Sequence, residues 1–247
     1  DTTVEVLTNS SVYGCILVIN ISPTLIKCCE DGTYGDYTFR HLDSGKAVNK
    51  LLLKLCLCST MIEEDYELLD VSKSTVTYKA FENEIQIHNQ VYKKTLDNLR
   101  PVCPGICASY NLGYNNKYSQ HILTELYNKG DEYVKAIIKS LIALMTEKQY
   151  TLGAIFMKFL EGFVTLTTII NNPTNSNRKR ITLSDEWERD PTLYDYSLSL
   201  TMYEIYRFAN AGYTHGDLHL DNVMINLNYN QGYLTNGSGS NIPGRAL

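Results

Sequence analysis

The chain has 247 residues, of which 44% are hydrophobic and 20% are charged. These values are ordinary for a globular protein that buries a core, and the length allows one large domain or two smaller lobes. The net charge of −5 argues against a general nucleic-acid-binding protein, because such proteins need excess positive charge to neutralise phosphates. No segment approaches about 18 uninterrupted apolar residues, so no membrane span is expected.

The seven cysteines lie mostly inside apolar runs. An odd number of cysteines in strand-like segments indicates reduced, buried thiols, and therefore an intracellular, reducing compartment. Cys103 and Cys107 have no second ligand pair nearby, so a zinc site is not expected there.

Residues 4–21 predict two strands around a polar turn that contains Gly14. Two short strands are predicted next, at 24–29 and 51–58. Each carries one lysine in apolar company, Lys27 in the first and Lys54 in the second.

A lysine flanked by apolar residues on both sides indicates a strand that is covered on both faces, where the ammonium group must meet an anion. The longer apolar run around Lys54 favours it over Lys27 for such a buried position. The alternative is an edge strand whose lysine reaches water.

Helical spacing predicts a helix over 78–96, with Phe81 and Ile85 on its apolar stripe. Glu84 lies on the same stripe, and a carboxylate there needs a cation. The alternative is that Glu84 lies at the margin of the stripe and is solvated.

Residues 106–110 predict a short strand, and residues 118–148 predict two helices joined by a turn at 128–131. The expected apolar stripe of the second helix consists of Ala136, Ile137, Ser140, Leu141 and Leu144.

Residues 152–157 predict a buried strand, and the polar segment 171–192 predicts a loop. A helix is then expected over about 194–212, ending at Ala211 and Gly212, since glycine is a common helix stop. Its expected buried face consists of Leu198, Met202, Ile205 and Phe208.

The most distinctive stretch follows this helix. Asp217 and Asn222 are five positions apart, with His215 and His219 beside them and the apolar run 223–225 directly after them. On a loop, the carboxylate and the amide can converge on one point. Such a pair suits a hydroxyl nucleophile beside a hard cation, because both groups supply oxygen atoms.

Residues 215–222 read HGDLHLDN. This stretch resembles the catalytic loop of the protein-kinase-like superfamily, which reads His-Arg-Asp-Leu-x-x-x-x-Asn in protein kinases. Gly216 replaces the arginine, and the resulting form is similar to aminoglycoside phosphotransferases and atypical kinases. A looser similarity to kinase-like proteins of large DNA viruses rests on residues 81–92 and 101–104.

The resemblance implies an α+β, two-lobed, protein-kinase-like fold. The small lobe, with an antiparallel sheet and a helical insertion near 118–148, is expected over 1–158. The hinge and an incomplete, mostly helical large lobe are expected over 159–247, and the chain is expected to stop before the Asp-Phe-Gly segment.

The implied function is transfer of the γ-phosphoryl group of ATP to a hydroxyl of a protein or small molecule, with Mg²⁺, as in serine/threonine protein kinases. The resemblance implies that Asp217 accepts the proton of the hydroxyl and that Asn222 binds Mg²⁺. His215 would brace the loop, and His219 would touch the γ-phosphate. A viral source would place the protein in the host cytoplasm or the virion.

The resemblance also implies residues that bind the nucleotide. Lys54, or alternatively Lys27, would grip the α- and β-phosphates, and Glu84 would pair with Lys54. The turn containing Gly14 would cover the phosphates, although it lacks the usual glycine-rich pattern.

The segment after the 152–157 strand resembles a kinase hinge. Met157 would pack behind the adenine, and backbone groups around Phe159 and Leu160 would meet its edge.

Two other functions remain open. The single glycine in the turn and the missing arginine favour a catalytically inactive, kinase-like nucleotide-binding or scaffold protein. The third hypothesis is a structural or interaction domain in which the motif is coincidental.

Overall fold

The computed structural model describes residues 1–8, 15–30, 47–59, 75–96, 101–167, 191–216, 218–219 and 222–226. The architecture is α+β, and the chain divides into two compact units. The first unit contains Asp1–Asn89 and Gly105–Phe159, and the second contains Gln90–Pro104 and Leu160–Leu247. The boundary expected between 158 and 159 stays a prediction.

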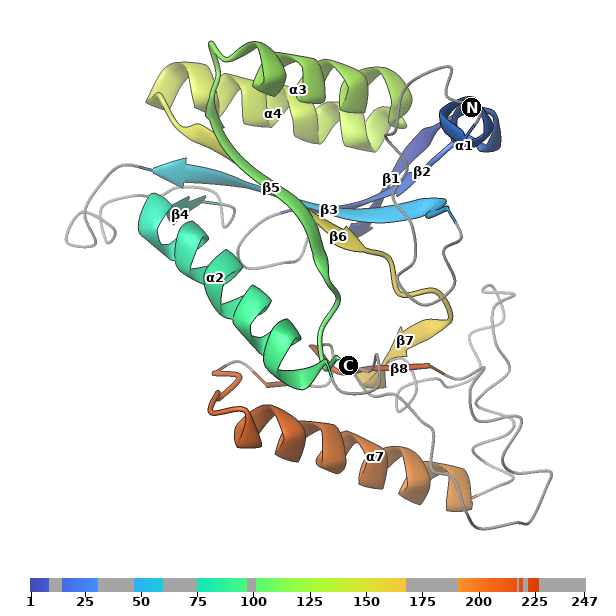
Figure 1. Ribbon diagram of the computed structural model, residues 1–247. Coiled ribbons are helices and arrows are strands. Elements are labelled where there is room, and N and C mark those ends of the chain that lie inside the picture. The colour runs from blue at the N-terminus through green and yellow to red at the C-terminus, as the bar shows by residue number, and fades with distance from the viewer. Residues whose placement is uncertain are drawn as a thin grey trace. The chain divides into compact units, whose positions relative to one another are not determined.

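A six-stranded sheet forms the centre of the first unit (Figure 1). Its order is β1-β2-β3-β6-β5, with antiparallel neighbours throughout, and β4 pairs with β3 in parallel. The strands are β1 (Thr3–Thr8), β2 (Cys15–Asn20), β3 (Lys50–Ser59), β4 (Thr75–Thr77), β5 (Ile106–Gly113) and β6 (Thr151–Lys158).

The central strand β3 is covered on both faces, as its apolar run predicts. Leu53, Leu55 and Leu57 belong to one core cluster. Cys56 and Cys58 alternate with them and belong to another cluster. Because successive side chains of a strand point to opposite faces, the two clusters lie on opposite sides of the sheet.

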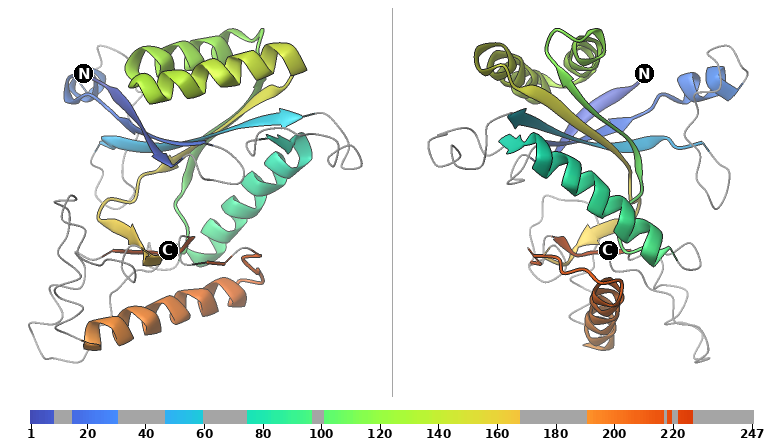
Figure 2. Two further views of the ribbon diagram at one scale, coloured as in Figure 1. Left: turned by 180° about the vertical axis from the view of Figure 1, so that it is seen from behind. Right: turned by 60° about the vertical axis from the view of Figure 1, so that its left-hand side comes forward.

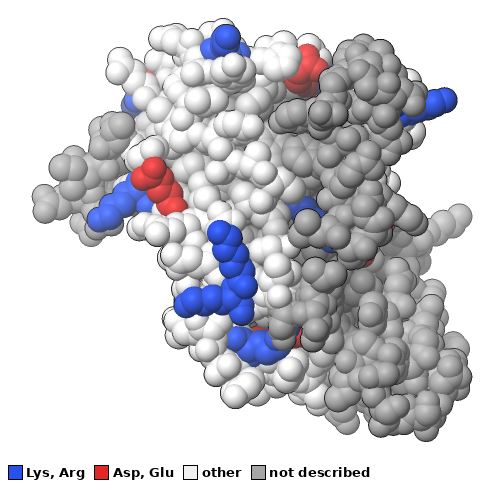
Figure 3. All heavy atoms as spheres, in the orientation of Figure 1, with Lys and Arg blue, Asp and Glu red and all other residues white. Residues whose placement is uncertain are grey.

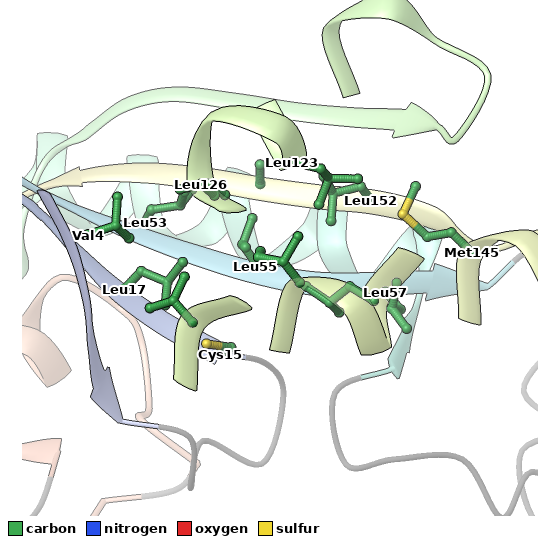
Figure 4. Packing of buried hydrophobic residues seen from close by; sticks show 14 of the residues in the cluster. Val4, Cys15, Leu17, Leu53, Leu55, Leu57, Leu123, Leu126, Met145 and Leu152 are labelled. Carbon is green, nitrogen blue, oxygen red and sulfur yellow. The ribbon is translucent and has the colours of Figure 1, made fainter. Parts of the chain in front are cut away.

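Helices α3 (Lys117–Lys129) and α4 (Glu132–Lys148) cover the face that carries the leucines (Figure 2). Their side chains meet those of the strands in one apolar layer (Figure 4). Asn116 and Asp131 start the two helices by accepting hydrogen bonds from backbone N–H groups of the first turn. The predicted helix pair is therefore confirmed.

The predicted stripe of the second of these helices is wrong in part. Leu141 is buried, and Ile137 and Leu144 are partly buried and pack against the core cluster, whereas Ala136 and Ser140 are exposed. The other buried residues of α4, Val134, Ile138 and Met145, were not predicted. Helix α4 is apolar around much of its circumference, so spacing alone allows more than one stripe.

Helix α2 (Tyr78–Thr95) confirms the helix predicted over 78–96. Phe81 on α2 packs with Cys56, Cys58 and Ile155 on the face of the sheet opposite to α3 and α4 (Figures 1 and 2). Gly153 of β6 permits this approach, because a Cβ atom there would lie 2.7 Å from the Phe81 ring and under 3 Å from both cysteine sulfurs.

The strand predicted at 24–29 is wrong, since helix α1 (Pro23–Glu30) occupies this segment. Ser22 precedes Pro23, and the carbonyl of Ser22 accepts a hydrogen bond from the N–H of Ile26 at 3.1 Å. Proline favours the first position of a helix because it lacks the N–H that would be unpaired there. This start signal outweighs the strand-like composition of the segment.

The second unit contains helix α7 (Pro191–Asn210) and a two-stranded sheet of β7 (Phe163–Thr165) and β8 (Met224–Asn226). The helix and its end before Gly212 are confirmed. Strand β8 contains the last two residues of the apolar run 223–225 and ends at Asn226. Strand β7 was not predicted. It pairs antiparallel with β8, and the N–H of Leu166 donates to the carbonyl of Val223 at 2.8 Å.

The predicted buried face of α7 is wrong in part. Leu198 and Met202 are exposed, whereas Leu200, Thr201 and Glu204 are buried. Glu204 forms an ion pair with Arg207 one turn later, at 2.5 Å, which allows a carboxylate to lie on the buried side.

Within the described segments, no helix has the length and apolar character needed to cross a membrane. On the face shown in Figure 3, the described basic and acidic side chains lie in small separate groups rather than in one patch of a single sign. The predicted turn at Gly14 and residues 171–190 of the predicted loop lie outside the described residues, and residues 191–192 belong to α7 rather than to a loop.

Candidate functional site

The first part of the candidate site is an ion pair between β3 and α2. Lys54 Nζ lies 2.5 Å from Glu84 Oε1. The side chain of Lys54 is 14% exposed and that of Glu84 is 38% exposed, so the lysine lies largely inside and the carboxylate lies at the rim. The ion pair implied by the resemblance is therefore present. The alternative is right in part, since Glu84 lies at the margin and is partly exposed to solvent, but it is paired with Lys54.

The placement of the pair follows from two periodicities. Lys54 has the same parity along β3 as Cys56 and Cys58, so it points to the face on which α2 packs. Glu84 follows Phe81 by three residues and therefore lies on nearly the same side of α2. The packing of Phe81 on the sheet thus brings Glu84 to Lys54.

The thiol of Cys56 does not supply the anion. Cys56 donates a hydrogen bond to Cys58, and this bond together with burial raises the pKa of Cys56, so its thiol stays protonated at neutral pH. The same hydrogen bond lowers the pKa of Cys58. The anion that contacts Lys54 is the carboxylate of Glu84.

The predicted hinge residues follow β6. Met157 packs against the cluster that contains Phe81 and Ile155. Lys50 Nζ lies 5.3 Å from the centre of the Phe159 ring, within the range of a cation–π interaction. The carbonyl of Leu160 accepts a hydrogen bond from the N–H of Phe163 at 3.4 Å.

The second part of the candidate site is the candidate catalytic loop, residues 213–222, which connects α7 to β8. Gly212 has a φ of 90° and ends α7, and Gly216 has a φ of 72°. A φ in this range disfavours residues with a Cβ atom, although nothing lies within 4 Å of the position that a Cβ would take at Gly216. The backbone conformation thus explains glycine, rather than arginine, at this position.

His219 and Asn222 are in contact through both backbone and side chain. The N–H of Asn222 donates to the carbonyl of His219 at 3.0 Å. The side chains also meet, with Asn222 Nδ2 2.9 Å from His219 Nε2. Because an amide nitrogen only donates, His219 Nε2 is the acceptor, and this contact does not use the amide oxygen of Asn222.

His215 is exposed, and its ring centre lies 5.9 Å from that of Phe208 on α7. The bracing of the loop by hydrogen bonds of His215 stays a prediction. Asp217 and Gly14 lie outside the described residues. Lys27, the alternative phosphate-binding lysine, is an exposed residue of α1 and does not lie in the sheet.

The structure brings the predicted residues together in two groups. Lys54 and Glu84 form one group in the first unit, and His219 and Asn222 form the other in the second unit.

Sequence reasoning missed two sets of neighbours. Lys50 shares the parity of Lys54 along β3, and this signal was readable in the sequence. Gln90 and Lys94, which contact Tyr213, gave no such signal because they are more than 110 residues away from it.

Asn222 is the described residue of the loop that could hold a hard cation. The oxygen of Asn222 is a suitable Mg²⁺ ligand, and the contact with His219 turns the amide nitrogen toward the imidazole. Among the described side chains, no group of three or more His, Cys, Asp or Glu could hold a metal. Cys15, Cys56 and Cys58 are buried free thiols, as predicted, whereas the free thiols Cys103 and Cys107 are partly buried and exposed, respectively.

Comparison with models of known protein families, with curated proteins and with solved structures finds no match.

Proposed function

We propose that the chain is an ATP-dependent phosphotransferase of the protein-kinase-like kind, which moves the γ-phosphoryl group to a hydroxyl acceptor. The Lys54–Glu84 ion pair is the observation that carries the proposal. A partly buried lysine that is held by a carboxylate at the edge of the core is oriented to meet a second anion, and the phosphates of a nucleotide supply one.

Each residue then has a role in phosphoryl transfer. Lys54 binds the α- and β-phosphates, and Glu84 holds its ammonium group in place. Asp217, which lies outside the described residues, accepts the proton of the attacking hydroxyl. Gly14 belongs to the turn that covers the phosphates.

Asn222 is the residue of the described loop that would hold Mg²⁺ through its amide oxygen. When bound, the ion neutralises negative charge on the phosphates. His219 acts by orienting the amide of Asn222, since its Nε2 accepts a hydrogen bond from the amide nitrogen.

The base of the nucleotide is proposed to lie beside the segment after β6. Met157 packs behind it, and the backbone at Phe159 and Leu160 offers hydrogen-bonding groups to its edge. Lys50 restrains the Phe159 ring from β3.

A catalytically inactive nucleotide-binding protein is the second candidate. Glycine in place of the loop arginine favours it, because the loop then lacks a cation that active protein kinases carry. Such a protein would bind ATP through Lys54 without transferring phosphate.

The deciding experiment follows phosphate from γ-labelled ATP and Mg²⁺ to dephosphorylated casein and to the chain itself. We expect Asp217→Asn to lower the transfer rate at least about 100-fold and to leave ATP affinity within about twofold, because a general base acts on the nucleophile rather than on bound ATP.

Asp221→Asn is the matched control, since it removes a carboxylate of the same loop and is expected to keep the wild-type rate. An unchanged rate in Asp217→Asn would contradict the assigned base. ATP binding by the wild type without any transfer would favour the inactive protein.

A further inference from the structure

The last turns of α2 make several long-range contacts with the end of α7 and the start of the candidate catalytic loop. Lys94 Nζ donates a hydrogen bond to the carbonyl of Ala211 at 3.2 Å. Ala211 directly follows α7, and its carbonyl is one of the groups that a helix end leaves without an intrahelical partner. A cation is also favourable at the negative end of the α7 dipole.

Tyr213, the first residue of the loop, is held by the same segment of α2. Its hydroxyl lies 2.7 Å from Gln90 Oε1. Lys94 Nζ lies 4.7 Å from the centre of its ring. The Phe208 ring of α7 lies 6.2 Å away, centre to centre. The ring of Tyr213 is thus fixed by two helices.

The two helix ends are also joined through buried groups. Arg207 on α7 donates to the carbonyl of Thr95 at 2.8 Å, and Glu204 holds Arg207 at 2.5 Å. The Thr95 hydroxyl donates to the carbonyl of Val91 at 2.7 Å. It also accepts from the N–H of Val102 at 3.1 Å, so the chain after α2 is held as well. These hydrogen bonds restrain the end of α2, from which Gln90 and Lys94 make their exposed contacts.

We infer that Gln90 and Lys94 are positioning residues that fix the start of the candidate catalytic loop through Ala211 and Tyr213. The inference rests on the proposed function, because it assigns them an effect on the rate of that reaction. Tyr213 is two residues before His215 and four before Asp217, so little backbone freedom separates the anchored ring from the proposed base. Neither side chain belongs to the proposed phosphate-binding group. Loss of either one is therefore expected to change the position of the loop and to leave ATP binding unchanged.

The first measurement is steady-state phosphoryl transfer by the full chain. Gln90→Ala and Lys94→Met are each expected to lower kcat about fivefold, which corresponds to the loss of one hydrogen bond, with KM for ATP within about twofold of the wild-type value. Lys94→Arg, which keeps a cation and a donor, is expected to restore most of the rate. Lys93→Met is the matched control, because Lys93 is an exposed neighbour on the same helix turn.

Equal kcat values in the wild type, Gln90→Ala and Lys94→Met would overturn the inference. An equal loss in Lys93→Met would also overturn it, because it would show a general effect of changes on this turn of α2.

The second measurement is hydrogen exchange of a peptide that covers residues 211–219, and it needs no activity. We expect exchange about fivefold faster in Gln90→Ala and Lys94→Met and unchanged in Lys93→Met, because a lost anchor lowers the local opening free energy.

Tyr213→Phe, which removes only the hydroxyl, should show the same increase in hydrogen exchange as Gln90→Ala. The double variant with both substitutions should exchange no faster than either single variant. If the wild type transfers no phosphate, the proposed function fails, and exchange alone decides whether α2 anchors the loop. Identical exchange in all variants would overturn the inference.

Discussion

Lys54 shows how a single residue can be interpreted from its environment. Its position in an apolar strand predicts a buried ammonium group that needs an anion, and Glu84 on the stripe of a helix predicts a carboxylate that needs a cation. Both expectations come from local patterns. Their pairing required the resemblance to kinases, because no local pattern states which helix packs on which strand. The pair is present, and its role in binding phosphate stays a proposal.

His219 has a contact that the sequence did not predict. Its expected contact with the γ-phosphate stays a prediction, and its Nε2 lies 2.9 Å from the amide nitrogen of Asn222. No local pattern in the sequence indicates that these two side chains meet.

A substitution tests the orienting role of His219. His219→Phe removes the acceptor, and we expect the Mg²⁺ concentration for half-maximal transfer to rise about fivefold, the effect of one lost hydrogen bond. His219→Gln keeps an acceptor and should show a smaller rise. A Mg²⁺ titration of the transfer rate measures both.

His121→Phe serves as the control, because His121 is an exposed residue of α3. An unchanged Mg²⁺ dependence in His219→Phe would remove His219 from the proposed metal site.

At the scale of elements, the strands β1, β2, β3 and β6 were predicted from short apolar or alternating runs, whereas β4 and β7 were missed. A short apolar run also fits a buried helix segment, and the strand predicted at 24–29 is instead helix α1. Helices α4 and α7 are apolar on several sides, so their buried stripes depended on tertiary packing that the sequence does not display. The error at α1 was avoidable, since Ser22 and Pro23 form a recognisable helix start.

The close approach of α2 to the sheet gives a prediction at this scale. Gly153→Ala places a methyl group under 3 Å from the Phe81 ring and from the sulfur atoms of Cys56 and Cys58. We expect a loss of about 1–3 kcal/mol in the free energy of unfolding, because overpacking forces side chains or α2 to move. Denaturant unfolding measures this loss.

Gly113→Ala is the matched control. Gly113 ends β5, and nothing lies within 4 Å of the position that its Cβ would take, so we expect a change within about 0.5 kcal/mol. Equal stabilities of the two variants would show that Gly153 is not required for the packing of α2.

At the scale of the whole molecule, the α+β class and the mostly antiparallel sheet that the resemblance implies are present. The two-stranded sheet of the second unit could not be predicted from the sequence, because β7 is only three residues long and pairs with β8 about 60 residues later. Helix α2 contributes Glu84 to the first unit and Gln90 to the second. One continuous helix therefore carries a residue of the proposed nucleotide site and a residue that holds the proposed catalytic loop.

Calorimetric titration of the full chain with ATP and Mg²⁺ tests the central claim most directly, because it needs no acceptor substrate. We expect the wild type to bind ATP and Lys54→Met to bind it at least about tenfold more weakly, since a charge-assisted contact to phosphate is lost. Lys27→Met, which changes the exposed lysine of α1, should bind like the wild type. Equal affinity of Lys54→Met and the wild type, or no ATP binding by the wild type, would contradict the account.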